Sequence, residues 1–190
     1  DTSLITMRKQ LTVIDQQITH LELVRNRLTH RCRQLEHVKA FHEQNQEVTI
    51  KEVRPKYLLW ADIERPQTFR EISIATKKCF SQALKDELPI YFQTGVIVPY
   101  KHILEERYTE ASVAFIPIEK TKKAKNIRLL PKGKAASIYH CGDYLSVDRS
   151  YKKLLEYCKD QQLTIVSDSY EFCTSGDENE YITEIFFYVQ

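Results

Sequence analysis

Residues 170–189 read YEFCTSGDENEYITEIFFYV, which is two arms rich in aromatic and β-branched residues joined by a polar segment containing a glycine. This pattern predicts a β-hairpin. Alternation along the second arm puts Ile182, Glu184, Phe186 and Tyr188 on one face of the strand. Both faces are largely apolar, so both are expected to be covered. Glu184 would then be a carboxylate inside an aromatic surface.

A carboxylate in such a surface needs a partner, because its removal from water costs several kcal/mol unless it is paired or protonated. No basic residue occurs between Asp168 and Gln190. The partner of Glu184, or of Glu171 in the first arm, must come from elsewhere in the chain or from a ligand, unless both carboxylates lie at exposed strand ends. A five-residue loop sets Glu171 opposite Thr183, and a shift of one residue sets it opposite Glu184.

The chain has 190 residues, 42% of them hydrophobic, and a net charge of +2. This composition suits one domain with an appendage and gives no overall field that favours nucleic acid. The five cysteines have no metal-binding spacing and indicate reduced thiols in a cytoplasmic protein. No apolar run is long enough to cross a membrane, and no cofactor, metal or catalytic motif is found. Because the chain begins at Asp1 inside a periodic pattern, we expect residues to be missing upstream.

Residues 1–46 form the first predicted unit, a single long helix. Apolar residues recur at alternating spacings of three and four, as in a heptad repeat. About 40 helical residues would span roughly 60 Å, longer than a small domain is wide, so we expect a coiled-coil homodimer through residues 4–35. The seam consists of Leu4, Met7, Leu11, Ile14, Ile18, Leu21, Arg25, Leu28, Cys32 and Leu35, broken only by the arginine.

Residues 47–190 form the second predicted unit, in which the order β-α-β-β occurs twice. The first set comprises strands at 57–63, 95–99 and 111–118 and a helix at 69–88. The second comprises a strand at 135–141, a helix at 145–159, and residues 163–166 leading into the hairpin. The expected fold is α+β, with both helices on one face of a joined sheet and a ligand groove between the halves on the other. The lysine-rich run at 120–134 is interpreted as a solvated connector.

The segment GKAASIYHCGDY at 133–144, together with the Tyr170-Glu171-Phe172 and Glu180 to Ile185 motifs, resembles the GyrI-like effector-binding domain of bacterial MerR-family multidrug-sensing regulators. The long helix resembles their dimerisation linker. The resemblance covers nearly the whole chain and implies antiparallel linker helices. It also implies that DNA is bound only through a winged helix-turn-helix domain not present in this sequence.

The same resemblance implies a protein that binds lipophilic, often cationic compounds in an aromatic pocket with an acidic floor. The family's ligand-binding glutamate carries onto Glu171, and a second acidic position onto Glu184. Aromatic faces attract a desolvated cation, although a protonated glutamate would equally suit a neutral ligand. The candidate walls are Trp60, Tyr91, Phe92, Tyr139, Tyr144 and Phe186, each of which could instead be a core residue. The alternative function is a GyrI-like hydrolase in which Glu184 or Glu171, beside Tyr139, acts as general base.

Overall fold

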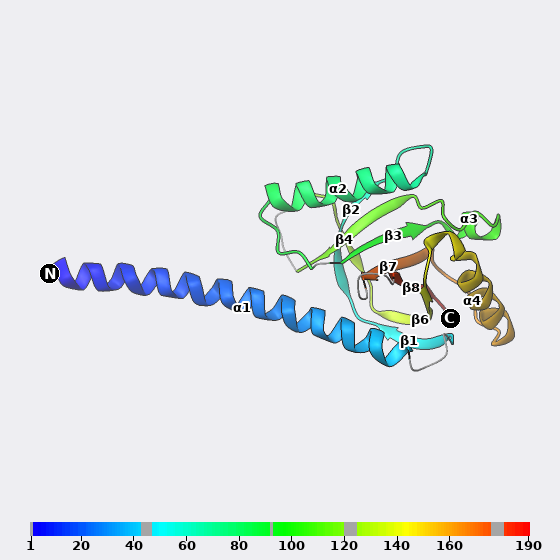
Figure 1. Cartoon of the computed structure of the whole chain (residues 1–190), viewed down its shortest axis with the longest axis horizontal. Helices are drawn as coiled ribbons and strands as arrows, with labels where there is room; N and C mark the ends of the chain where they lie inside the picture. The colour runs from blue at the N-terminus through cyan, green and yellow to red at the C-terminus, as the bar shows by residue number, and fades with distance from the viewer. Residues whose placement is uncertain (1, 43–46, 92, 120–124, 176–180) are drawn as a thin grey trace.

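The computed structural model describes residues 2–42, 47–91, 93–119, 125–175 and 181–190. A long helix leads into a domain with one β-sheet and three further α-helices (Figure 1). The helices are α1 (Thr2–His42), α2 (Phe69–Lys85), α3 (Tyr100–Leu104) and α4 (Asp148–Asp160), with a 3-10 turn at Tyr144–Ser146. The strands are β1 (Thr49–Val53), β2 (Lys56–Asp62), β3 (Thr94–Val98), β4 (Val113–Ile118), β5 (Ile127–Leu130), β6 (Gly133–Cys141), β7 (Ser169–Ser175) and β8 (Tyr181–Tyr188).

The eight strands form one antiparallel sheet in the order β1-β6-β8-β7-β3-β4-β2-β5. Only Arg54 and Pro55 connect β1 to β2, although these strands lie at nearly opposite ends of that order. Two residues can span only about 10 Å, so the sheet must curl until its two edges approach. Val53 of β1 and Leu130 of β5 accordingly belong to one buried cluster.

Residues paired across the sheet share a face, and two adjacent rows define the two sides. One row runs Trp60, Phe115, Gly95, Phe172, Glu184 and Tyr139. The next row runs Ala61, Ala114, Val96, Glu171, Ile185 and Ile138. The side that carries the first row is called the concave face, and the side that carries the second is called the helix face.

Helices α2 and α4 both pack on the helix face. Ala75 of α2 and Tyr151 and Leu154 of α4 join Val96 and Ile185 in the largest buried cluster. A sheet covered on one side by amphipathic helices can bury its other side only against itself. The curl of the sheet does this by bringing Phe115, Phe172 and Phe186 together on the concave face.

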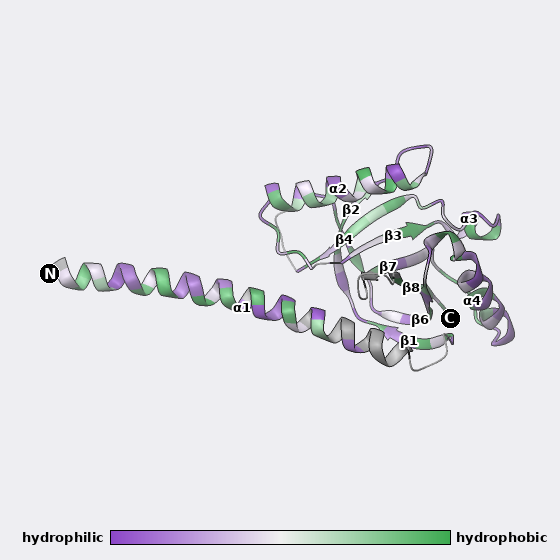
Figure 2. Cartoon of the chain, in the orientation of Figure 1, coloured by the Kyte–Doolittle hydropathy of each residue, from purple (hydrophilic) through white to green (hydrophobic). Residues whose placement is uncertain are grey.

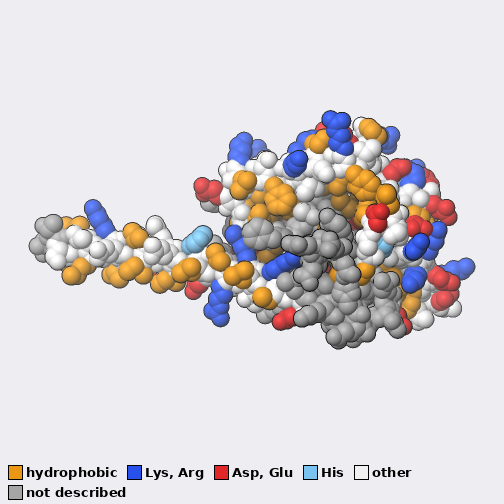
Figure 3. Space-filling model, in the orientation of Figure 1, with side chains coloured by type: hydrophobic (Ala, Val, Ile, Leu, Met, Phe, Trp, Pro, Cys, Tyr) orange, Lys and Arg blue, Asp and Glu red, His pale blue; other side chains and the backbone are white. Residues whose placement is uncertain are grey.

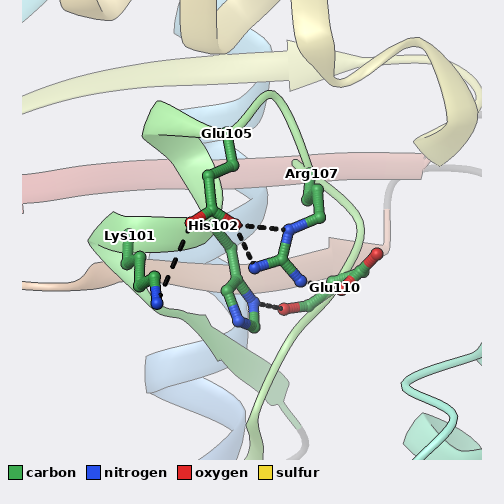
Figure 4. A network of polar contacts seen from close by, with 5 residues as sticks. All are labelled: Lys101, His102, Glu105, Arg107 and Glu110. Atoms are coloured by element: carbon green, nitrogen blue, oxygen red, sulfur yellow. Dashed lines mark hydrogen bonds and ion pairs between the residues drawn. The ribbon is translucent and has the colours of Figure 1, made fainter.

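The loop after α3 is held by a polar network on the molecular surface. Arg107 bonds the carboxylates of Glu105 and Glu110, and Nδ1 of His102 lies 2.8 Å from the Glu110 carbonyl oxygen (Figure 4). These exposed ion pairs contribute little stability individually. Their role is local, in fixing the chain between α3 and β4.

Helix α1 projects away from the domain for most of its length (Figure 1). Apolar and polar residues alternate along it (Figure 2), and hydrophobic side chains gather along one edge of it (Figure 3). Seven of the predicted seam residues, Leu4, Met7, Leu11, Ile14, Ile18, Leu21 and Leu28, are between 48% and 64% exposed. Pairing with a second helix remains a prediction. None of the described helices is apolar enough over a sufficient length to cross a membrane.

Several expectations need correction. Part of the run interpreted as a connector forms β5, an edge strand paired with β2. Residues 163–166 lead into β7 and contain an isolated bridge, between Ile165 and Val189. In the hairpin, Glu171 lies opposite Ile185, two residues beyond the expected Thr183, because the pair nearest the turn is Ser175 with Tyr181. Internal duplication remains a prediction, although β2-α2-β3-β4 and β6-α4-β7-β8 follow one order and meet where β3 pairs with β7.

Candidate functional site

Glu171 lies in the middle of β7, on the helix face, and is completely buried. Strand alternation places it beside Ser169, and the amphipathic α4 presents Tyr151 to both. The Tyr151 hydroxyl donates a hydrogen bond of 2.5 Å to Oε1 of Glu171, and its oxygen lies 2.8 Å from the Ser169 hydroxyl. One carboxylate oxygen is therefore fixed by a short chain of hydroxyl groups.

The other oxygen of Glu171 is different. Neither Oε2 nor the buried Tyr144 hydroxyl has a hydrogen-bond partner within the described part of the chain. Tyr144 nevertheless lies close enough that, in addition to burial, the Glu171 carboxylate raises its pKa. The Tyr144 hydroxyl also lies close enough to Glu171 to lower the pKa of that carboxylate, so the two groups form a contact that lacks the geometry of a full hydrogen bond.

The electrostatics of Glu171 follow from this isolation. Burial raises its pKa to about 7, and the hydroxyls of Tyr151 and Tyr144 oppose the shift without cancelling it. Among the residues that the structure describes, no basic side chain contributes to the pKa of this carboxylate. Near neutral pH the group is therefore divided between a carboxylic acid and an uncompensated carboxylate. It can accept a cation, or exchange hydrogen bonds with a neutral ligand.

Aromatic rings surround this carboxylate. Tyr151 stacks on Tyr108 at a centroid distance of 5.3 Å and tilts toward Phe187 at 6.1 Å. Tyr144 meets Phe69, the first residue of α2, edge to face at 5.5 Å. Phe69 is 48% exposed whereas Glu171 is fully buried. The Phe69–Tyr144 pair is thus a partly exposed aromatic cover beside the buried carboxylate, and a ligand could reach Glu171 by displacing it.

Glu184 lies on the concave face and has the partner that Glu171 lacks. Lys51 of β1 forms an ion pair with it, and the Ser137 hydroxyl donates a hydrogen bond of 3.2 Å. Burial alone would raise the pKa of Glu184, but Lys51 and Lys56 hold it below the ordinary value. Tyr139 is directly opposite Glu184, and burial followed by this carboxylate raises the pKa of Tyr139. Glu184 is therefore already a compensated anion.

A cavity of about 610 Å³ opens beside this pair. Within it, Nζ of Lys51 lies 4.8 Å from the centroid of the Phe186 ring, and Nζ of Lys56 lies 4.7 Å from that of Phe172. The lining is formed by Lys51, Glu52, Val53, Arg54, Lys56, Leu130, Phe172, Glu184 and Phe186.

The structure divides the predicted site residues between the two faces. Glu171 and Tyr144 lie together on the helix face, whereas Glu184, Tyr139 and Phe186 lie on the concave face. Trp60 is also on the concave face, but the guanidinium carbon of Arg128 lies over it, 3.4 Å from the centroid of the ring. Tyr91 lies between α2 and β3. Burial and the Glu119 carboxylate raise its pKa, and Arg27 opposes the shift. Phe92 lies outside the described residues.

Sequence reasoning missed Tyr151, Lys51 and Lys56. The helical period indicates only that Tyr151 faces the buried side of its helix, and its alignment with Glu171 depends on tertiary packing. The two lysines flank Arg54 and Pro55, and a short link between distant strands is the signal that could have placed them over the sheet. Within the described residues no cluster of three His, Cys, Asp or Glu side chains could hold a metal.

Comparisons with known proteins agree with this architecture. Residues 47–190 match the model of the GyrI-like small molecule binding domain. The crystal structure of the EcmrR C-terminal domain superposes with a TM-score of 0.60 at 20% identity, covering 76% of this chain and 97% of that one. The cryo-EM structure of an EcmrR–DNA complex superposes with a TM-score of 0.59 at 19% identity, covering 97% of this chain and 71% of that one.

A hydrolase from Listeria innocua superposes with a TM-score of 0.52 at 9% identity, covering 81% of this chain and 97% of that one. At these identities the structural likenesses show a shared fold alone. No curated protein sequence matches the chain.

Proposed function

The chain belongs to the GyrI-like family of small-molecule-binding domains, and from that membership we propose that it senses effectors for a dimeric MerR-family transcription regulator. The effector class is lipophilic cations, and the binding group is Glu171. The observation that supports this proposal is the buried Glu171 carboxylate: within the described part of the chain, Oε2 has no hydrogen bond of full geometry and no basic side chain influences the pKa.

A cationic ligand would supply the positive charge that Glu171 lacks among the described residues. An ion pair in a site removed from water is stronger than one at the surface, and each aromatic face adds about 0.5–2 kcal/mol for a desolvated cation. Tyr144 and Tyr151, the two aromatic side chains whose hydroxyls lie at the carboxylate, offer such faces. Binding at Glu171 would displace the Tyr144–Phe69 pair and so move the 3-10 turn relative to the start of α2.

The regulator part of the proposal rests on α1. Its exposed apolar seam is suited to a second copy of the chain, and EcmrR, whose fold is similar, has been visualised on DNA. DNA binding would come from a domain outside this sequence. A ligand could bias such a regulator only by the difference between its affinities for the two conformations.

The proposal is tested by calorimetric titration with (2-naphthylmethyl)trimethylammonium and its neutral carbon isostere, 2-neopentylnaphthalene. We expect the protein to bind the cation at least about tenfold more tightly than the isostere, since about 1.4 kcal/mol of charge interaction gives that factor. Glu171→Gln should abolish the preference. Glu184→Gln removes a carboxylate already paired with Lys51 and is the matched control. Equal binding of both probes, or a loss in Glu184→Gln alone, would contradict the proposal.

The second candidate function is hydrolysis, favoured by the pKa of about 7 of Glu171, which suits a general base at neutral pH. The hydroxyl groups next to Glu171 are those of Tyr151 and Tyr144. Tyr139, the expected neighbour, lies opposite Glu184 instead. The test is release of 2-naphthol from 2-naphthyl acetate. Turnover by the wild type that is lost in Glu171→Gln would support the enzyme. Binding of the cationic probe without turnover would support the sensor.

A further inference from the structure

The cavity on the concave face carries an excess of positive charge. Its lining contains three basic and two acidic residues. Glu52 forms an ion pair with Lys132, at 3.5 Å, and Glu184 forms one with Lys51. Lys56 is left without an ion-pair partner of its own among the described residues. One ammonium group in the cavity is therefore not matched by a carboxylate.

Lys56 is held in place rather than free to extend into solvent. It begins β2 and is half-buried, with its nitrogen over the Phe172 ring at 4.7 Å. Burial lowers its pKa; Glu184 opposes this shift, and the ammonium of Lys51 adds to it. A cation–π contact of this kind contributes only about 0.5–2 kcal/mol, less than an ion pair with full hydrogen bonding in such a place.

From this cavity we infer a second binding site, for a small organic monoanion: a carboxylate or sulfonate on a flat body of one or two rings. The anionic group would bind Nζ of Lys56, with Lys51 beside it, and the volume of about 610 Å³ accommodates the body. This site lies on the opposite side of the sheet from Glu171 and does not depend on the proposed function.

Charge also decides against a cation in this cavity. A cation at Glu184 would have to share that carboxylate with the Lys51 ammonium, which already bonds Oε1, and it would lie near Lys56 as well. Two like charges at short range repel each other strongly where water is scarce. An anion at Lys56 would leave the Lys51–Glu184 pair in place, and the repulsion from Glu184 would be partly offset by Lys51.

The experiment uses calorimetric titration of the whole chain with three probes that share one ring system: 2-naphthoate, 2-naphthamide and 2-naphthylmethylammonium. We expect 2-naphthoate to bind at least about tenfold more tightly than the other two. Lys56→Met keeps the apolar stem and should lose that preference. Lys152→Met removes an equal charge from the exposed face of α4 and should keep it.

Glu184→Gln is the most decisive variant, because an anion site and a cation site should respond to it in opposite directions. Removing the carboxylate raises the net charge of the cavity, so 2-naphthoate should bind about threefold or more tightly to this variant, whereas a cation site would weaken for its cation. Glu171→Gln should leave 2-naphthoate binding unchanged, which separates this result from the fate of the proposed function. Should Lys56→Met fail to fold, Lys56→Arg should retain binding and Glu184→Gln still decides. The inference is overturned if 2-naphthoate binds no better than 2-naphthamide, or if Glu184→Gln weakens it.

Discussion

At the scale of single residues, Glu171 and Glu184 show how position decides the chemistry of one residue type. The two side chains project from paired neighbouring strands onto opposite faces. Lys51 reaches Glu184 and lowers its pKa, whereas burial raises the pKa of Glu171 to about 7 and no basic side chain among the described residues opposes that shift. The first carboxylate is an ordinary compensated ion. The second is a buried carboxyl group without a basic partner among the described residues.

The raised pKa of Glu171 predicts an unusual dependence of stability on pH. The folded chain holds this proton up to about pH 7 whereas the unfolded chain releases it near 4.5. The folded state binds more protons between these values, so the free energy of unfolding falls as pH rises through this window and levels off above it. The loss from this group is on the order of 3 kcal/mol.

Urea unfolding at pH 5 and pH 8 measures this effect. The wild type should lose more stability between the two pH values than Glu171→Gln, which has no proton to release. The Glu184→Gln variant serves as control, since a lowered pKa changes stability only at more acidic pH. Identical pH dependence in the wild type and Glu171→Gln would show that the carboxylate is solvated or paired.

At the scale of elements, the contact between β3 and β4 depends on Gly95. A Cβ atom there would lie 2.3 Å from the Phe115 ring and 2.4 Å from the carbonyl oxygen of Glu171. The missing side chain allows Phe115 and Phe172 to meet edge to face at 4.9 Å. The absence of a side chain at Gly95 therefore lets the phenylalanine rings of β4 and β7 pack against each other across β3.

Gly95→Ala should reduce the free energy of unfolding by roughly 1–3 kcal/mol, a usual cost of overpacking, because one obstacle is backbone and cannot rotate away. Chemical denaturation measures the change. Gly133→Ala is the matched comparison, since its Cβ would meet only the Tyr188 ring, at 2.9 Å. We expect it to cost less. A Gly95→Ala protein as stable as the wild type would mean that the sheet can separate at this point.

Most elements of the domain could be predicted from the sequence because they bury one face and so have a clear period. Alternation placed Glu184 on the same face as Phe186 and Tyr188 correctly. The hairpin register could not be predicted, because the loop length does not fix where pairing begins. The Lys51–Glu184 pair joins residues 133 positions apart and leaves no local pattern. Ile127–Leu130 was missed because a short edge strand among lysines has the composition of a solvated loop.

At the scale of the whole molecule, the sheet separates two chemically opposite regions. The helix face holds an uncompensated carboxylate under aromatic rings, and the concave face holds an uncompensated ammonium over them. The concave site includes β1, the first strand after α1. A ligand bound there would contact the strand nearest the proposed dimerisation helix in sequence, so the two sites could influence the dimer through different elements.

The dimer itself is the last prediction. A seam side chain that becomes buried against a second helix contributes about 1.5–3 kcal/mol, and seven such side chains are exposed in the single chain. We expect sedimentation equilibrium to report a dimer for the wild type. Ile18→Asp would bury a carboxylate in the seam at a cost of several kcal/mol and should shift the protein to monomer. Gln16→Asp adds the same charge two residues away, off the seam, and should remain dimeric. If both variants dimerise as the wild type does, the chains associate through the domain instead; a monomeric wild type would mean that the exposed seam of α1 serves another partner.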